Sequence, residues 1–202
     1  MSRVEVLCLN ISVPLNTAAS ILTLCTRVKT LNLRFPCHLF GRNPILPPLE
    51  NLQRIKALYV DLSSIFNSQA IYLPDISIFR RITHLHLTNT WATWYPTANS
   101  IGLDQLPQIT HFSLFLSTIR TLPGLLKKIV DHENLAVLVL WKRFLTNNGA
   151  AVRFLVDSGI NDRCVLLLEQ QLFRSHTLDG GFWEAAEQAV KQREGTDSEG
   201  SF

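Results

Sequence analysis

The chain of 202 residues contains little charge and no long apolar run. Charged residues make up 17% of it, against about 25% in an average domain, whereas 47% of the residues are hydrophobic. This balance excludes a largely disordered protein. The net charge of +3 arises from 19 basic and 16 acidic residues without a long basic block, so nucleic-acid and membrane-surface binding are not favoured.

Several functional signals are also missing. No apolar run reaches the ~18 residues of a membrane-spanning helix, and the N-terminal residues show no signal-peptide pattern, so we expect a cytoplasmic or nuclear protein. The four cysteines form no C-x-x-C pair, which favours reduced thiols over a zinc site. Walker, H-E-x-x-H and G-x-S-x-G motifs are absent. We therefore expect neither an enzyme nor a cofactor.

What the sequence does contain is a repeat with the skeleton Ile-x-x-Leu-x-Leu, as in residues 82–87. Subtraction of residue numbers gives spacings of 24, 27, 27, 27 and 26 between the central apolar residues, which are Leu7, Leu31, Leu58, Leu85, Phe112 and Leu138. A weaker seventh copy covers residues 164–168. Because successive side chains of a strand point to opposite faces, each copy predicts a short strand with its leucines in a core and the residues between them facing outward.

The segments between the strands differ in character. Apolar residues at helical spacing predict helices over 18–25 and 122–130. Four prolines between residues 36 and 48 indicate a loop that ends in a short helical turn. Residues 91–100, which contain two tryptophans, a tyrosine and a proline, predict an irregular aromatic loop.

After the sixth strand we expect a short helix over 150–157 and a second helix over about 182–192. The apolar stripe of the second helix is suited to a C-terminal cap on the last repeat, and it consists of Phe182, Ala185, Ala186, Ala189 and Val190. Residues 194–202 are polar and are expected to form a disordered tail.

A period of 20–29 residues with a Leu-x-Leu strand is the signature of leucine-rich repeats, and the sequence resembles that family. The run Gly180–Glu187 and the Thr-His-Leu and Thr-His-Phe strands resemble uncharacterised leucine-rich-repeat proteins of mushroom-forming fungi. Many of these look like the recognition half of F-box proteins, and the resemblance covers roughly residues 3–193.

The repeat and the resemblance imply an α/β leucine-rich-repeat solenoid of about six or seven parallel strands with a helical C-terminal cap, forming a single domain over residues 3–193. The resemblance also implies a non-catalytic protein-interaction module with a recognition surface for a protein ligand. No F-box segment precedes the first repeat, so attachment to a Skp-type adaptor is not implied.

The outward positions of successive strands would form one concave surface, and they are Thr30, Asn32, Arg34, Ala57, Tyr59, Asp61, His84, His86, Thr88, His111, Ser113 and Phe115. Within it we expect Tyr59, His86 and Phe115 to form an aromatic ridge flanked by Arg34 and Asp61. Aromatic and arginine anchors carry most of the energy of protein interfaces, so these five residues are the candidate protein-binding site. The alternative is that they are simply solvated strand residues.

Three histidines of this surface raise the alternative of a metal site. His84 and His111 occupy equal places in consecutive copies, about 4.8 Å apart if the strands pair, with His86 beside them. No carboxylate or thiol accompanies them in the sequence pattern. We therefore interpret them as ordinary surface histidines and expect no metal.

Two ends of the repeat array require cover. At the sixth copy the outward positions Val137, Val139 and Trp141 are apolar, and we expect the C-terminal segment to cover them. The first strand, within residues 4–9, would be a sheet edge with unpaired backbone groups. The alternative function is therefore a self-associating or structural repeat protein that pairs through this edge, or a truncated fragment of a longer F-box/leucine-rich-repeat protein.

Overall fold

The computed structural model describes residues 4–35, 43–66, 72–88, 101–115, 123–142, 148–160, 164–169 and 181–199. The chain forms two compact units, Met1–Ile109 (unit 1) and Thr110–Phe202 (unit 2), and each is described by itself. The single domain over residues 3–193 stays a prediction. The predicted aromatic loop over 91–100 lies outside the described residues.

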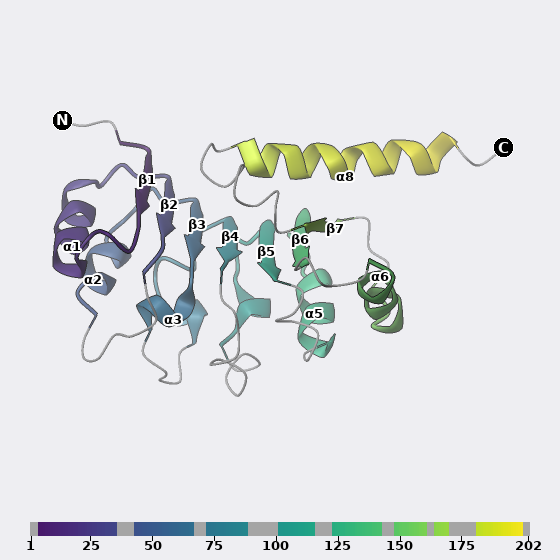
Figure 1. Cartoon of the computed structure of the whole chain (residues 1–202), viewed down its shortest axis with the longest axis horizontal. Helices are drawn as coiled ribbons and strands as arrows, with labels where there is room; N and C mark the ends of the chain where they lie inside the picture. Colours follow the sequence, from purple (N-terminus) through teal and green to yellow (C-terminus); the bar gives the residue numbers. More distant parts are fainter. Residues whose placement is uncertain are drawn as a thin grey trace. The chain divides into compact units, whose positions relative to one another are not determined.

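Unit 1 contains four parallel strands in sequence order (Figure 1), namely β1 (Val6–Leu9), β2 (Thr30–Leu33), β3 (Ala57–Val60) and β4 (His84–Leu87). The register aligns equivalent residues of each copy, so that Leu31, Leu58 and Leu85 form one buried column. The next inward positions, Leu33 and Val60 among them, form a second column. The prediction that the leucines of these strands lie in a core is thereby confirmed.

A recurring hydrogen-bond pattern joins the copies of unit 1. The carbonyl of Lys29 accepts bonds from the N–H groups of Lys56 and Ala57 at 2.8 and 3.0 Å, and the carbonyl of Lys56 accepts from Thr83 and His84 at 2.9 and 3.0 Å. Because each strand satisfies its backbone groups against the next, a short strand that would not be stable alone becomes stable in the array.

The connections of unit 1 carry α1 (Leu15–Leu24), α2 (Leu46–Glu50), α3 (Leu62–Ile65) and two short 3₁₀ turns, η1 (Leu73–Asp75) and η4 (Leu103–Gln105). The first two agree with the predicted helix and the predicted short helical turn, and α2 contains Pro47 and Pro48 in its first turn. Gly102, just before η4, has a φ of 73°, and a Cβ there would lie 2.6 Å from Cε2 of Tyr72 and 2.8 Å from Cδ of Pro74. Only glycine fits this close approach of two connections.

Unit 2 contains three parallel strands, β5 (His111–Phe115), β6 (Val137–Lys142) and β7 (Val165–Glu169), in that order. The weak seventh copy is therefore a strand of the sheet. Helices α5 (Pro123–Val130) and α6 (Asn148–Asp157) lie in its connections, as predicted.

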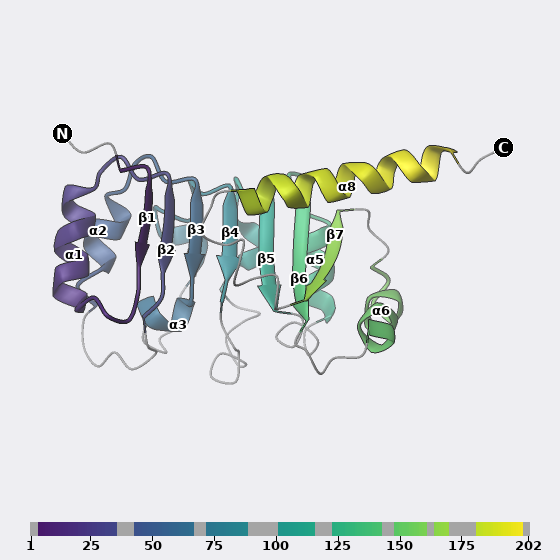
Figure 2. The same cartoon turned by 45° about the horizontal axis from the view of Figure 1, so that its top comes forward.

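The C-terminal helix α8 (Gly181–Glu199) lies on one face of these strands, with α5 on the opposite face (Figures 1 and 2). It contacts β6 and β7, so the C-terminal segment does cover the apolar outward side of β6. This position of α8 differs from the predicted cap on the end of the leucine columns, because the helix packs on the outward strand face. Its buried side chains are Phe182, Trp183, Ala186 and Val190, whereas Ala185 is exposed.

The prediction of a disordered tail from residue 194 is wrong as far as residue 199, because the α8 backbone stays helical to Glu199. Extending an existing helix adds one hydrogen bond for each residue that is ordered, whereas starting a helix orders several residues for the first bond. A polar segment can therefore continue a helix that it would not begin.

Candidate functional site

The outward face of unit 1 is organised as rows across the strands. Register pairing places Cys8, Asn32, Tyr59 and His86 side by side in the middle row. Neighbouring positions in such a row lie about 4.8 Å apart. Cys8 is an exposed free thiol at the β1 end of the row, and the other three side chains are buried.

The expectation that the aromatic residues are exposed is wrong. Tyr59, His86 and Phe115 are 3%, 0% and 4% exposed. Tyr59 and His86 lie side by side on adjacent strands, with ring centroids 5.5 Å apart, so each ring covers part of the other. Phe115 belongs to unit 2, where it pairs in register with Trp141 of β6. The five predicted residues therefore do not form one described cluster.

The two charged members of the predicted site lie at the margin of the row and are half-buried. Asp61 is the N-cap of α3 and accepts a hydrogen bond from the backbone N–H of Ser63 at 2.9 Å. Its carboxylate therefore has a local structural role. Arg34 follows β2 directly, and its backbone N–H donates to the carbonyl of Leu9 at 2.9 Å.

Electrostatics make His86 a neutral group. Burial, with a smaller contribution from the positive charge of Arg34, lowers the pKa of His86 from 6.5 to about 3. A neutral imidazole can donate one hydrogen bond and accept another, but it contributes no charge to the face at physiological pH. The centre of the row is thus uncharged, and the charges lie at its edge.

Asn32 is the residue of this face that the sequence placed correctly but did not single out. Its side chain is 5% exposed, and among the described residues neither Oδ1 nor Nδ2 has a hydrogen-bond partner. Buried polar side chains are nearly always paired, so such an amide requires an explanation. Its sequence signal, a polar residue between two strand leucines, is shared by many outward positions.

The outward face of unit 2 holds α8 through aromatic contacts. Phe182 stacks on Trp141 with ring centroids 5.5 Å apart, and Trp183 meets His111 edge to face at 5.4 Å. The indole N–H of Trp141 donates to Ser113 Oγ at 2.6 Å. A buried Trp therefore has both its apolar and its polar surface satisfied.

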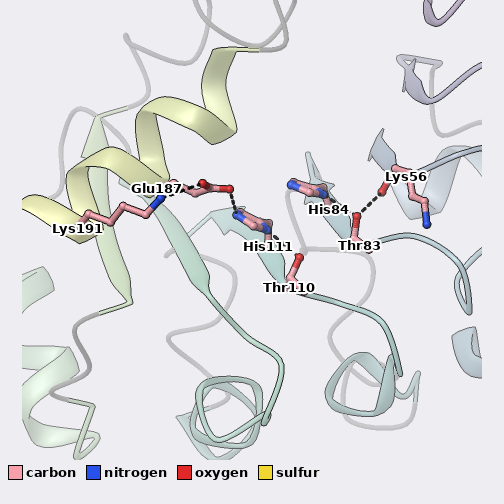
Figure 3. Close-up of polar contacts among 7 residues, drawn as sticks. All are labelled: Lys56, Thr83, His84, Thr110, His111, Glu187 and Lys191. Atoms are coloured by element: carbon pink, nitrogen blue, oxygen red, sulfur yellow. Dashed lines mark hydrogen bonds and ion pairs between the residues drawn. The ribbon is translucent and has the colours of Figure 1, made fainter. Parts of the chain in front are cut away.

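His111 links the strand and the helix by polar contacts (Figure 3). Its Nδ1 lies 2.8 Å from the hydroxyl of Thr110, and its Nε2 lies 3.0 Å from Glu187 of α8, which also approaches Lys191 at 3.7 Å. Burial lowers the pKa of His111, and the carboxylate of Glu187 partly opposes that shift. The sequence analysis did not single out Trp183 or Glu187, which share a helix face four residues apart.

The interpretation of the histidines as surface residues is wrong for His86 and His111, which are buried. His84 is half-buried in unit 1, and its Nδ1 lies 2.7 Å from the hydroxyl of Thr83 (Figure 3), the contact that His111 repeats in unit 2. A Thr-His pair before a strand thus forms the same local contact in both copies. That no metal is bound stays a prediction.

Comparison of the chain with protein-family models, with curated proteins and with solved structures gives no match. Within the described ranges, no helix combines the length and the apolar character that crossing a membrane requires. The site is therefore interpreted from its own geometry.

Proposed function

We propose that the chain is a non-catalytic protein-interaction module of the leucine-rich-repeat solenoid type, which recognises a protein ligand on the outward strand face of unit 1. The observation that carries the proposal is the row of Asn32, Tyr59 and His86, a buried uncharged centre with the charged residues Arg34 and Asp61 at its margin. Protein interfaces likewise place uncharged residues at the centre and charged residues at the rim.

A second observation supports the use of a strand face for recognition. In unit 2 the equivalent face holds a helix, α8, through Phe182, Trp183 and Glu187. Outward residues of short parallel strands are therefore compatible with the binding of a polypeptide segment. This function does not require attachment to a ubiquitin ligase.

The test is selection of a random-peptide display library against residues 1–202, followed by titration of the selected peptides. We expect Arg34→Ala to weaken their binding, because Arg34 lies at the margin of the face. Arg27→Ala is the matched control, since Arg27 is exposed outside the strands. Selected peptides that bind both variants as tightly as the parent chain would place recognition elsewhere.

Self-association is a second candidate, favoured by the edge strand. Among the described residues β1 pairs only with β2, and Val6 on its outward face is 56% exposed. An unpaired edge is a template for another strand. If copies pair through it, sedimentation velocity will show a dimer of residues 1–202 that Val6→Lys dissociates, whereas a monomer at high concentration would exclude this function.

A further inference from the structure

Unit 1 contains two buried asparagines with opposite surroundings. Asn43 is 8% exposed and fully engaged: its Nδ2 donates to the carbonyls of Ser64 and Ile65 at 3.2 and 2.9 Å, and its Oδ1 accepts from the N–H of Ile45 at 3.0 Å. Asn32 is 5% exposed, and its donor and its acceptor lack a partner in the part of the chain that the structure describes. Local structure thus accounts for Asn43 but not for Asn32.

The row around Asn32 offers its carboxamide no hydrogen bond. On the β3 side lies Tyr59, whose ring packs with that of His86, and on the β1 side lies the thiol of Cys8. The row is open at this β1 side, where both Cys8 and Val6 are exposed. A ligand that enters from β1 would therefore meet Asn32 before it meets the two rings.

The chemistry of a carboxamide restricts what such a ligand is. The group presents an N–H donor beside a C=O acceptor, so both are satisfied at once only by a group with the reverse arrangement. A carboxylate or phosphate would bond the donor and leave Oδ1 unpaired, and a simple cation would leave Nδ2 unpaired. In an extended segment the backbone N–H and C=O of one residue point to the same side, so a single residue satisfies both.

We propose that Asn32 is a recognition residue that pairs with the backbone N–H and C=O of one residue of an extended protein segment lying across β1, β2 and β3. This inference rests on the proposed function, because it names the part of the protein ligand that the face of unit 1 recognises. The groups that cover the carboxamide in the free protein give it no hydrogen bond, so a ligand displaces none when it binds. A ligand without the matching amide would leave Asn32 unpaired, which is the condition under which polar sites discriminate most strongly.

The first experiment uses N-acetylglycine N-methylamide, which carries the backbone N–H and C=O of one residue, as the probe. In chains labelled with ¹⁵N at asparagine, we expect it to shift the side-chain NH₂ signals of Asn32 in a saturable manner and to leave those of Asn43 unchanged. Asn32 is assigned by the loss of its signals in Asn32→Leu, with Asn32→Ala as the reserve variant if the leucine prevents folding. Equal shifts of the two asparagines, or no saturable shift at Asn32, would overturn the proposal.

The second experiment uses the peptides selected by display on the parent chain. We expect Asn32→Leu to weaken their binding about tenfold or more, and N-methylation of one peptide amide in the ligand to have the same effect on the parent chain only. Peptides that bind Asn32→Leu as tightly as the parent overturn the role of Asn32 while the proposed function stands. If no peptide is selected but N-acetylglycine N-methylamide saturates Asn32, the amide site is supported and the proposed function fails.

Discussion

The two buried asparagines of unit 1 provide a stability prediction with opposite signs for the same substitution. In Asn32→Leu and Asn43→Leu, an apolar side chain of similar volume replaces a carboxamide at a buried position. The burial and the change in chemistry are matched. Only the hydrogen bonding of the asparagine that is removed differs.

Asn43→Leu removes three hydrogen bonds and leaves two carbonyls and one N–H without their partner. At about 1 kcal/mol for each bond, the free energy of unfolding should fall by about 3 kcal/mol. Asn32→Leu removes a buried amide that has no protein partner, and the free energy of unfolding should rise by about 1–3 kcal/mol. For a chain of this size, 1 kcal/mol corresponds to a shift in Tm of about 2–4 °C.

The assay is urea unfolding followed by circular dichroism and by tryptophan fluorescence, with a thermal scan of each variant. The expected order of midpoints is Asn32→Leu, then the parent chain, then Asn43→Leu, with an unchanged m-value. A loss of stability in Asn32→Leu equal to that in Asn43→Leu would refute the reasoning, because it would show that the Asn32 amide is satisfied in solution, for example by an ordered water.

Three further predictions concern other parts of the chain. Gly102→Ala should lower the free energy of unfolding by about 2–4 kcal/mol, because the φ of Gly102 is positive and the added Cβ would make close contacts. Gly124→Ala in α5, where a Cβ meets no atom within 4 Å, should raise the free energy of unfolding by about 0.5–1 kcal/mol. Chemical denaturation of both variants measures the two effects. Because the pKa of His86 is about 3 in the folded state and 6.5 when unfolded, the unfolded chain binds more protons below pH 6.5. The free energy of unfolding should therefore fall as the pH is lowered, by up to about 1.4 kcal/mol per pH unit. In denaturation curves between pH 7 and 4, His86→Gln should flatten this dependence on pH, and an unchanged dependence would assign it to other groups. Phe182→Ala should lower the free energy of unfolding of unit 2 by about 3–4 kcal/mol and increase the binding of an apolar dye as the face under α8 opens. Glu187 is partly exposed, so Glu187→Gln should change the free energy of unfolding by less than about 1 kcal/mol. Equal effects of the two variants would contradict a mainly apolar attachment of α8.

The two outward faces differ in what they need from a partner. In unit 2 the indole of Trp141 is stacked on Phe182 and hydrogen-bonded to Ser113, so that face is already satisfied by the chain itself. In unit 1 the amide of Asn32 is buried without a partner. Unpaired polar groups of this kind destabilise the free protein and are retained where a function requires them. This contrast is why we place recognition on unit 1.

Local rules were sufficient for the repeat. The spacing of Leu31, Leu58 and Leu85 predicted three strands and their inward leucines, because strand alternation depends only on adjacent residues and is the same in every copy. The short helical turn of α2 and the weak seventh strand were also predicted from local sequence patterns. The apolar outward side of β6 also predicted its cover by the C-terminal segment, since exposed apolar strands are unfavourable.

The sequence by itself therefore determined the strands, their inward columns and the parallel α/β character of the chain. Tertiary structure alone decided which outward residues are buried. Tyr59 and His86 are buried side by side on adjacent strands, and His111 is buried where Trp183 packs on it. It also decided that Asn43 reaches three backbone groups while Asn32 reaches none. The physical reason is that alternation is a property of neighbouring residues, whereas burial and hydrogen bonding of an outward side chain depend on groups far away in the sequence.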